Sequence, residues 1–323
     1  MVRLRANAEF GEATCAQRVD LLHRPEVKLD MLRAELYRIV HRKWFYLFLG
    51  AGVCVGLGGF VQQQFTQISM GSAPHEYNGV YVFLQIFGAN FNSFWGGVIP
   101  LIAVLAASDL LCADLATGFS MPMMLRVGVR KYFVDKFIAN AIAVFMGTVI
   151  FLTIDLGIAI LWRGDLQWPP ILKFVMIKGL PQLTHGETAF SGVIRSSYQP
   201  LVLPWLFWHV PYAFTALEIV INGLVLTTVS SIAVIAALWI RNRYLVLATP
   251  FLVYWALNVG LQFMHLFQWI PTSMGGSFFF TTAPFTAILL YWTVPLALLF
   301  LILLLAAPRR YLRLSLSPKE TNR

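Results

Sequence analysis

Long runs of apolar residues, separated by shorter polar stretches, dominate the pattern along this chain. Six runs stand out, at about 44–61, 94–111, 137–162, 210–240, 245–266 and 287–307. Each run holds at least 18 residues, and at about 1.5 Å per residue a helix of that length approaches the thickness of a bilayer's hydrocarbon core. The pattern therefore predicts an all-α polytopic membrane protein, with six transmembrane helices in one domain spanning 44–310.

The residues before the first run follow an amphipathic pattern instead. Between 28 and 43, apolar residues recur at helical spacing, and Arg33, Glu35 and Arg38 occupy positions between them. This predicts an amphipathic helix that lies in the membrane interface. Residues 1–27 have no clear period and are interpreted as a poorly ordered cytoplasmic extension. Residues 311–323 are interpreted as a basic cytoplasmic tail.

Composition and charge exclude some classes of protein and orient the chain. The sequence is 58% hydrophobic and only 12% charged, about half the charged fraction of soluble domains. The net charge of +9 raises the question of nucleic-acid binding. The positions of the Lys and Arg residues favour membrane topology as the explanation instead. Of the 24 Lys and Arg residues, 20 fall before the first run, after the last one, or in the two loops on that same side. The positive-inside rule then predicts that both termini are cytoplasmic.

The loop between the second and third runs carries the most informative motif. Asp114 is followed by Gly118, then by Arg130, and then by Lys136 where the third run begins. Together with Leu32-Arg33-Ala34-Glu35-Leu36-Tyr37 and then Arg42-Lys43-Trp44 at the start of the first run, this ordered set resembles the ABC-2 type permease family, the type V-like membrane subunits of bacterial ABC exporters. The resemblance covers about residues 29–310. The sequence departs from the family at Phe119, where Thr is usual, and in the long loop after the third run.

The resemblance implies a chain that works with partners in the bacterial inner membrane. Two copies of an ATP-binding subunit would bind ATP and Mg²⁺, and a second permease subunit would complete a homodimer or heterodimer. The sequence has no GxxxxGK[ST] motif, so the chain is not expected to hydrolyse ATP itself or to bind a cofactor or metal. The family pattern assigns an ATPase-coupling loop to Asp114, Gly118, Arg126, Arg130, Lys131 and Lys136, and an elbow helix to Arg33, Glu35 and Arg38. The alternative is that these cations anchor the helix ends to anionic lipid.

Polar side chains inside the apolar runs suggest a second kind of site. Ionisable groups within a bilayer are costly and mark functional positions by default. The candidate residues for a translocation path are Asp155, Glu218, Asn222, Asn258, Gln262 and His265. Asn258, Gln262 and His265 repeat at i, i+4 and i+7, which predicts one helical face. The same residues also fit interhelical hydrogen bonds that hold the bundle together. Gly52 and Gly56 form a GxxxG pair, which predicts close helix packing, with a dimer seam as one location.

Three functions are weighed against these patterns. The favoured one is the permease subunit of an ATP-driven exporter, moving a hydrophobic or amphipathic peptide, antibiotic or lipid-like substrate outward. The alternative is an ATP-independent carrier or channel, although the two halves of the chain show no clear internal repeat. An intramembrane enzyme is disfavoured, because the sequence contains no HExxH or GxSxG motif.

Overall fold

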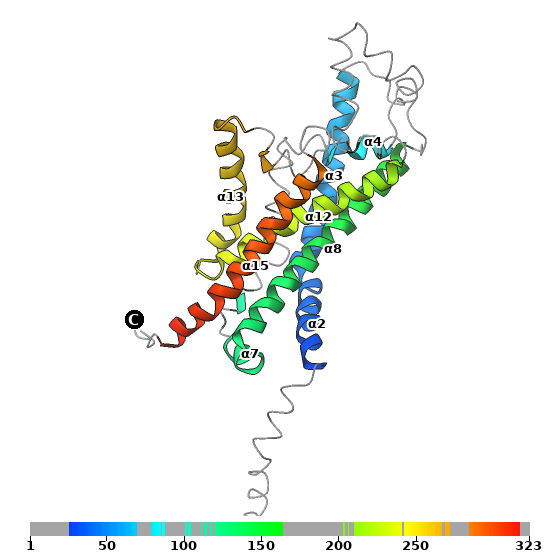
Figure 1. Cartoon of the computed structure of the whole chain (residues 1–323). Helices are drawn as coiled ribbons and strands as arrows, with labels where there is room; N and C mark the ends of the chain where they lie inside the picture. Colours follow the sequence, from blue (N-terminus) through cyan, green and yellow to red (C-terminus); the bar gives the residue numbers. More distant parts are fainter. Residues whose placement is uncertain are drawn as a thin grey trace, which may run out of the picture.

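A computed structural model describes residues 26–69, 79–84, 86–87, 101, 103–104, 111, 113–114, 117, 120–163, 203, 206, 210–240, 242–266, 269–271 and 284–316. Within these residues the regular structure is helical, with no strand (Figure 1). The helices are α2 (Glu26–Val40), α3 (Lys43–Ser69), α4 (Gly79–Leu84), α7 (Ser120–Val127), α8 (Val129–Arg163), α12 (Pro211–Ala236), α13 (Arg243–Phe263) and α15 (Phe285–Leu316).

Five of these helices are long and apolar enough to cross a membrane, namely α3, α8, α12, α13 and α15. They correspond to five of the six runs predicted from the sequence. The main difference is length: α8 begins at Val129 rather than 137, and α15 continues to Leu316, into the predicted tail. These extensions are polar, so an apolar run cannot reveal them. Most of the predicted run 94–111 lies outside the described residues.

Helices α8 and α12 form the centre of the bundle. α8 packs against α2, α3, α4, α12 and α15, and α12 also packs against α13 and α15. In the most apolar stretch of α12, 83% of the residues are buried inside the protein, whereas the corresponding share in the other four candidate spans is 17–39%. The small polar side chains of this central helix are satisfied within the protein. Thr227 and Ser231 donate to carbonyls one turn earlier, and Ser230 donates to Asn140 on α8 at 3.2 Å.

The contacts between helices also give their directions. Gly147 of α8 lies against Phe48 of α3, and Gly52 of α3 lies against Phe151 of α8. Because the residue numbers of the contacting positions rise together along both helices, α3 and α8 run in the same direction. Gly223 of α12 lies against Phe145, whereas Ser230 bonds to Asn140, so α8 and α12 are antiparallel. The start of α8, the α12–α13 connection and the end of α15 lie at one end of the bundle (Figure 1).

The predicted amphipathic segment 28–43 forms helix α2, which begins two residues earlier and ends at Val40. A turn at His41 and Arg42 separates it from α3. Met31, Glu35 and Ile39 form a buried stripe at i, i+4 and i+8, and α8 is the principal helix packed against α2. The predicted apolar face of this segment thus includes a buried acid and contacts protein.

Candidate functional site

A cluster of buried charges joins α2 to the beginning of α8. The Lys136 ammonium lies at its centre, with Nζ 2.7 Å from Oε2 of Glu35 and 2.5 Å from Oδ2 of Asp114. Arg38 Nη2 lies 2.9 Å from Oδ1 of Asp114, and its Nη1 lies 3.1 Å from Oε1 of Glu35. Two acids therefore share two cations, and the cluster has no net formal charge.

A tyrosine completes the hydrogen bonding of the Asp114 carboxylate. The Tyr132 hydroxyl donates to Oδ2 of Asp114 at 3.2 Å, and the Tyr132 side chain is fully buried. Tyr132 and Lys136 are four residues apart on α8, so both side chains extend from the same helical face. Asp114 thus accepts from Arg38, Tyr132 and Lys136. Sequence reasoning missed Tyr132, although its spacing from Lys136 is a usable signal.

Exposure differs among the members of this charge cluster. The side chains of Glu35, Asp114 and Lys136 are 2–4% exposed, whereas that of Arg38 is 34% exposed. Burial acts to raise the pKa of the Asp114 carboxyl, but hydrogen bonds and charge from Arg38 and Lys136 outweigh it and hold that pKa below its usual value. The hydrogen bond to Asp114 raises the pKa of Arg38 above its usual value. Asp114 is therefore ionised and paired near neutral pH.

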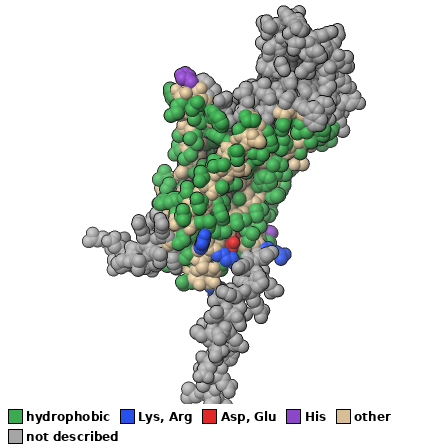
Figure 2. Space-filling view, in the orientation of Figure 1, with side chains coloured by type: hydrophobic (Ala, Val, Ile, Leu, Met, Phe, Trp, Pro, Cys, Tyr) green, Lys and Arg blue, Asp and Glu red, His purple; other side chains and the backbone are tan. Residues whose placement is uncertain are grey.

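The structure separates the predicted coupling residues into two groups. Glu35 and Arg38 of the predicted elbow helix contact Asp114 and Lys136 of the predicted loop. Arg33, Arg126 and Arg130 are exposed instead, and Lys131 is half-buried. Gly118 lies outside the described residues. Lysine and arginine side chains gather at the end of the molecule where α7 and α8 begin, below a surface covered by hydrophobic side chains (Figure 2).

The predicted intramembrane acid Asp155 lies between α8 and α3. Its side chain is fully buried, and both of its carboxyl oxygens lack a hydrogen-bond partner. A Cβ added at Gly56 of α3 would collide with this carboxyl, and one added at Gly52 would collide with Phe151. The GxxxG pair therefore packs α3 closely on α8 within one chain, as the sequence predicts. Because α8 covers this face of α3, Gly52 and Gly56 are not available for contact with a second subunit.

Glu218 is another buried acid in the bundle. It lies on α12, 2% exposed, and its Oε1 atom has no hydrogen-bond partner. Asn222, one turn later and also buried, donates to the main-chain carbonyl of Glu218 rather than to its carboxyl. Asp155 and Glu218 thus lie inside the bundle with carboxyl groups that are not fully hydrogen-bonded. Asp135, near the start of α8, is also buried with one carboxyl oxygen unpartnered.

The three predicted residues on the fifth run do not share one environment. Asn258 is buried and donates to the Tyr254 carbonyl at 2.8 Å. Gln262 is exposed, and His265 is exposed beyond the end of α13 with φ at 56°. Because the helix ends at Phe263, His265 does not continue the helical face that the spacing predicts.

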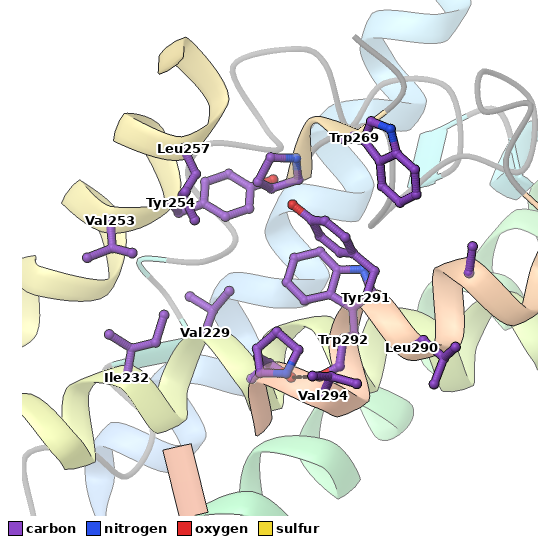
Figure 3. Close-up of a pocket in the computed structure, with 14 residues that line it drawn as sticks. Val229, Ile232, Val253, Tyr254, Leu257, Trp269, Leu290, Tyr291, Trp292 and Val294 are labelled. Carbon is purple, nitrogen blue, oxygen red and sulfur yellow. Dashed lines mark hydrogen bonds between the residues drawn. The ribbon is translucent and has the colours of Figure 1, made fainter. Parts of the chain in front are cut away.

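A cavity of about 540 Å³ lies between α12, α13 and α15. Its walls are formed largely by aliphatic and aromatic side chains, several of which are drawn in Figure 3. None of the six predicted path residues lines it. The path assigned to those residues stays a prediction, and the cavity is a separate feature that the sequence pattern did not reveal.

The site was also compared with metal-binding arrangements, and the chain with known proteins. In the part of the chain that the structure describes, no group of three or more His, Cys, Asp or Glu side chains could hold a metal ion. Comparison of the chain with protein-family models, curated proteins and solved structures finds no match in any of the three.

Proposed function

We propose that this protein is the permease subunit of an ATP-driven exporter in the bacterial inner membrane, working with two ATP-binding subunits and a second permease subunit. The proposal rests on the resemblance to ABC-2 type permeases and on one structural observation. The buried charge cluster joins the segment assigned to the elbow helix to the segment assigned to the coupling loop. It does so through Glu35 and Arg38 on α2, Asp114 ahead of α7, and Lys136 near the start of α8.

The physical argument concerns force transmission. A subunit driven by an external ATPase needs a rigid connection from its cytoplasmic end to helices that cross the membrane. The charge cluster provides one, because α2 is held to α8, and α8 packs against both α3 and α12. Exposed Arg33, Arg126 and Arg130 near this connection offer cations to an acidic partner surface. On this proposal the same end of the bundle is cytoplasmic, and the substrate is hydrophobic or amphipathic.

Helix direction supports the proposed sixth span at 94–111. Helices α3 and α8 are parallel, so the chain has to return from the end of one to the start of the other between Ser69 and Val129. The 59 residues from 70 to 128 lie between these two helices, and one crossing takes only about 20 residues. The apolar run at 94–111 is the segment suited to that crossing.

The experiment that tests the proposal is purification of the tagged full chain from its native host, followed by reconstitution in vesicles. We expect a P-loop ATPase to co-purify, and ATP to be required for export. The double variant Arg126→Glu/Arg130→Glu should release the ATPase and abolish ATP-dependent transport. Arg243→Glu, which changes an exposed cation outside the predicted coupling loop, is the matched control and should keep both. Transport by the purified chain alone without ATP would reject the proposal.

The second candidate is an ATP-independent carrier coupled to protons. The observation that favours it is the pair of buried acids, Asp155 and Glu218, whose carboxyl groups lack full hydrogen bonding inside the bundle. Intramembrane acids of this kind occur in proton relays. A pH gradient imposed across vesicles that contain only this chain should then drive transport, and Asp155→Asn should abolish it. An ATPase-dependent exporter shows no such gradient-driven transport.

A further inference from the structure

The cavity between α12, α13 and α15 lies at membrane depth. Its walls include Val229 and Ile232 of α12, Val253 and Leu257 of α13, and Leu290 and Val294 of α15. All three helices are candidate membrane spans, and each of these residues lies within the apolar part of its helix. The surroundings of the cavity are therefore hydrocarbon rather than water.

The cavity is open toward the lipid side of the bundle. Val253, Leu257, Leu290 and Val294, from its two outer walls, are 36–59% exposed. α13 and α15 both pack on α12, which forms the floor between them. Figure 3 shows the lining side chains of α13 on the left and those of α15 toward the right, with Val229 and Ile232 below the α13 side chains. A ligand can thus enter sideways, between α13 and α15, without leaving the membrane.

A tryptophan marks one end of the cavity. Trp269 follows the end of α13 and is 38% exposed. Tyr254 and Tyr291 extend toward one another deeper in the cavity, where they adjoin Val253 and Leu290 (Figure 3). Tryptophan favours the level of the lipid headgroups, where an apolar ring meets a polar layer. This arrangement suits an amphiphile with its polar end beside Trp269 and its apolar part deeper in the bundle.

We propose that this cavity binds one acyl chain of a bilayer phospholipid, which enters between α13 and α15 and keeps its headgroup beside Trp269. A volume of about 540 Å³ lies within the range of small-molecule sites. An empty cavity would forfeit the van der Waals contacts of its walls, and the surrounding lipid supplies chains that restore them. The proposal does not depend on ATP-driven export, because it rests on the cavity alone.

Photocrosslinking tests this proposal directly. The full chain is placed in nanodiscs of phosphatidylethanolamine and phosphatidylglycerol that contain a trace of phosphatidylethanolamine with a diazirine in the middle of one acyl chain. After illumination, adducts are mapped by mass spectrometry. We expect the densest labelling at residues 290–294 of α15 and 253–257 of α13, above that at Leu298 and Leu301. These two are 52% and 49% exposed but lie outside the cavity lining.

Matched variants separate a bound chain from the general lipid contact of any membrane helix. Leu257→Trp narrows the cavity and should reduce labelling at 290–294 about fivefold or more. Leu252→Trp makes the same change on α13 at a residue that is 58% exposed and does not line the cavity, and should leave labelling unchanged. Ile232→Phe fills the cavity from α12 and serves if Leu257→Trp does not accumulate. Equal labelling in the filled and control variants, or labelling no denser than at Leu298, would overturn the proposal.

Discussion

Two sets of buried acids in this molecule differ in whether their carboxyl groups have partners. At the α2–α8 junction, Glu35 and Asp114 are ion-paired with Arg38 and Lys136. Inside the bundle, Asp155 lies against Gly56 with no hydrogen-bond partner for either oxygen. An ionised carboxylate without a partner is too costly at such a place, so we expect Asp155 to be protonated. On this comparison partners, rather than burial alone, decide which acids carry charge.

The strongest test of this comparison removes the shared cation. Lys136→Met keeps the length of the side chain but leaves Glu35 and Asp114 buried with only Arg38 to balance them. Breaking a buried pair in this way costs about 3–5 kcal/mol, so the free energy of unfolding in detergent should fall by that amount. Lys131→Met, five residues earlier on α8 and half-buried, is the control. The role of the charge cluster is refuted if both variants unfold alike.

Identical substitutions in the two regions should give different results. Asp114→Asn replaces a carboxylate that accepts hydrogen bonds from two cations, and should lower the free energy of unfolding by about 2–3 kcal/mol. Asp155→Asn replaces a neutral group by another of the same shape and should cost less than about 1 kcal/mol. Thermal unfolding of both variants beside the wild type measures the difference. A large loss in Asp155→Asn would mean that Asp155 is ionised and has a partner.

The glycine beside Asp155 offers a steric test of the same site. In Gly56→Ala the added methyl group meets the Asp155 carboxyl, and overpacking of this kind costs about 1–3 kcal/mol. Gly50→Ala on the same helix is the control, because nothing lies within 4 Å of a Cβ there. We expect the thermal unfolding temperature to be lowered only in Gly56→Ala. Equal effects would show that α3 does not pack closely on α8 at Gly56.

The smallest expected effect is a pH dependence of the paired region. Because Arg38 and Lys136 hold the pKa of Asp114 below its usual value, this carboxyl stabilises the fold above its unfolded pKa of about 3.9. That stabilisation should be lost as pH falls from there through the lower folded pKa. Thermal unfolding temperatures measured across this acidic range should fall less steeply in Asp114→Asn than in the wild type. Identical slopes would contradict the assignment.

Helix prediction succeeded where apolar residues continue and failed where a helix becomes polar. The run at 137–162 revealed the membrane part of α8 but not its first turns, because Lys131, Asp135 and Lys136 interrupt the apolar pattern. The spacing of Asn258, Gln262 and His265 suggested one face, yet α13 ends before His265. Local composition thus indicates which segments cross a membrane, but it does not indicate where their polar ends stop.

The sequence by itself determined that five of the described helices are apolar enough to span a membrane, because that property depends only on length and residue type. It also identified Glu35, Arg38, Asp114 and Lys136 as candidates, although in two separate groups. Only the tertiary structure decided that these four residues neutralise one another, because 101 residues separate Glu35 from Lys136. Packing likewise decided that Asp155 lies against Gly56 and that α12, α13 and α15 leave a cavity between them. No local pattern encodes which distant surfaces meet, so charge state and cavities follow from the fold.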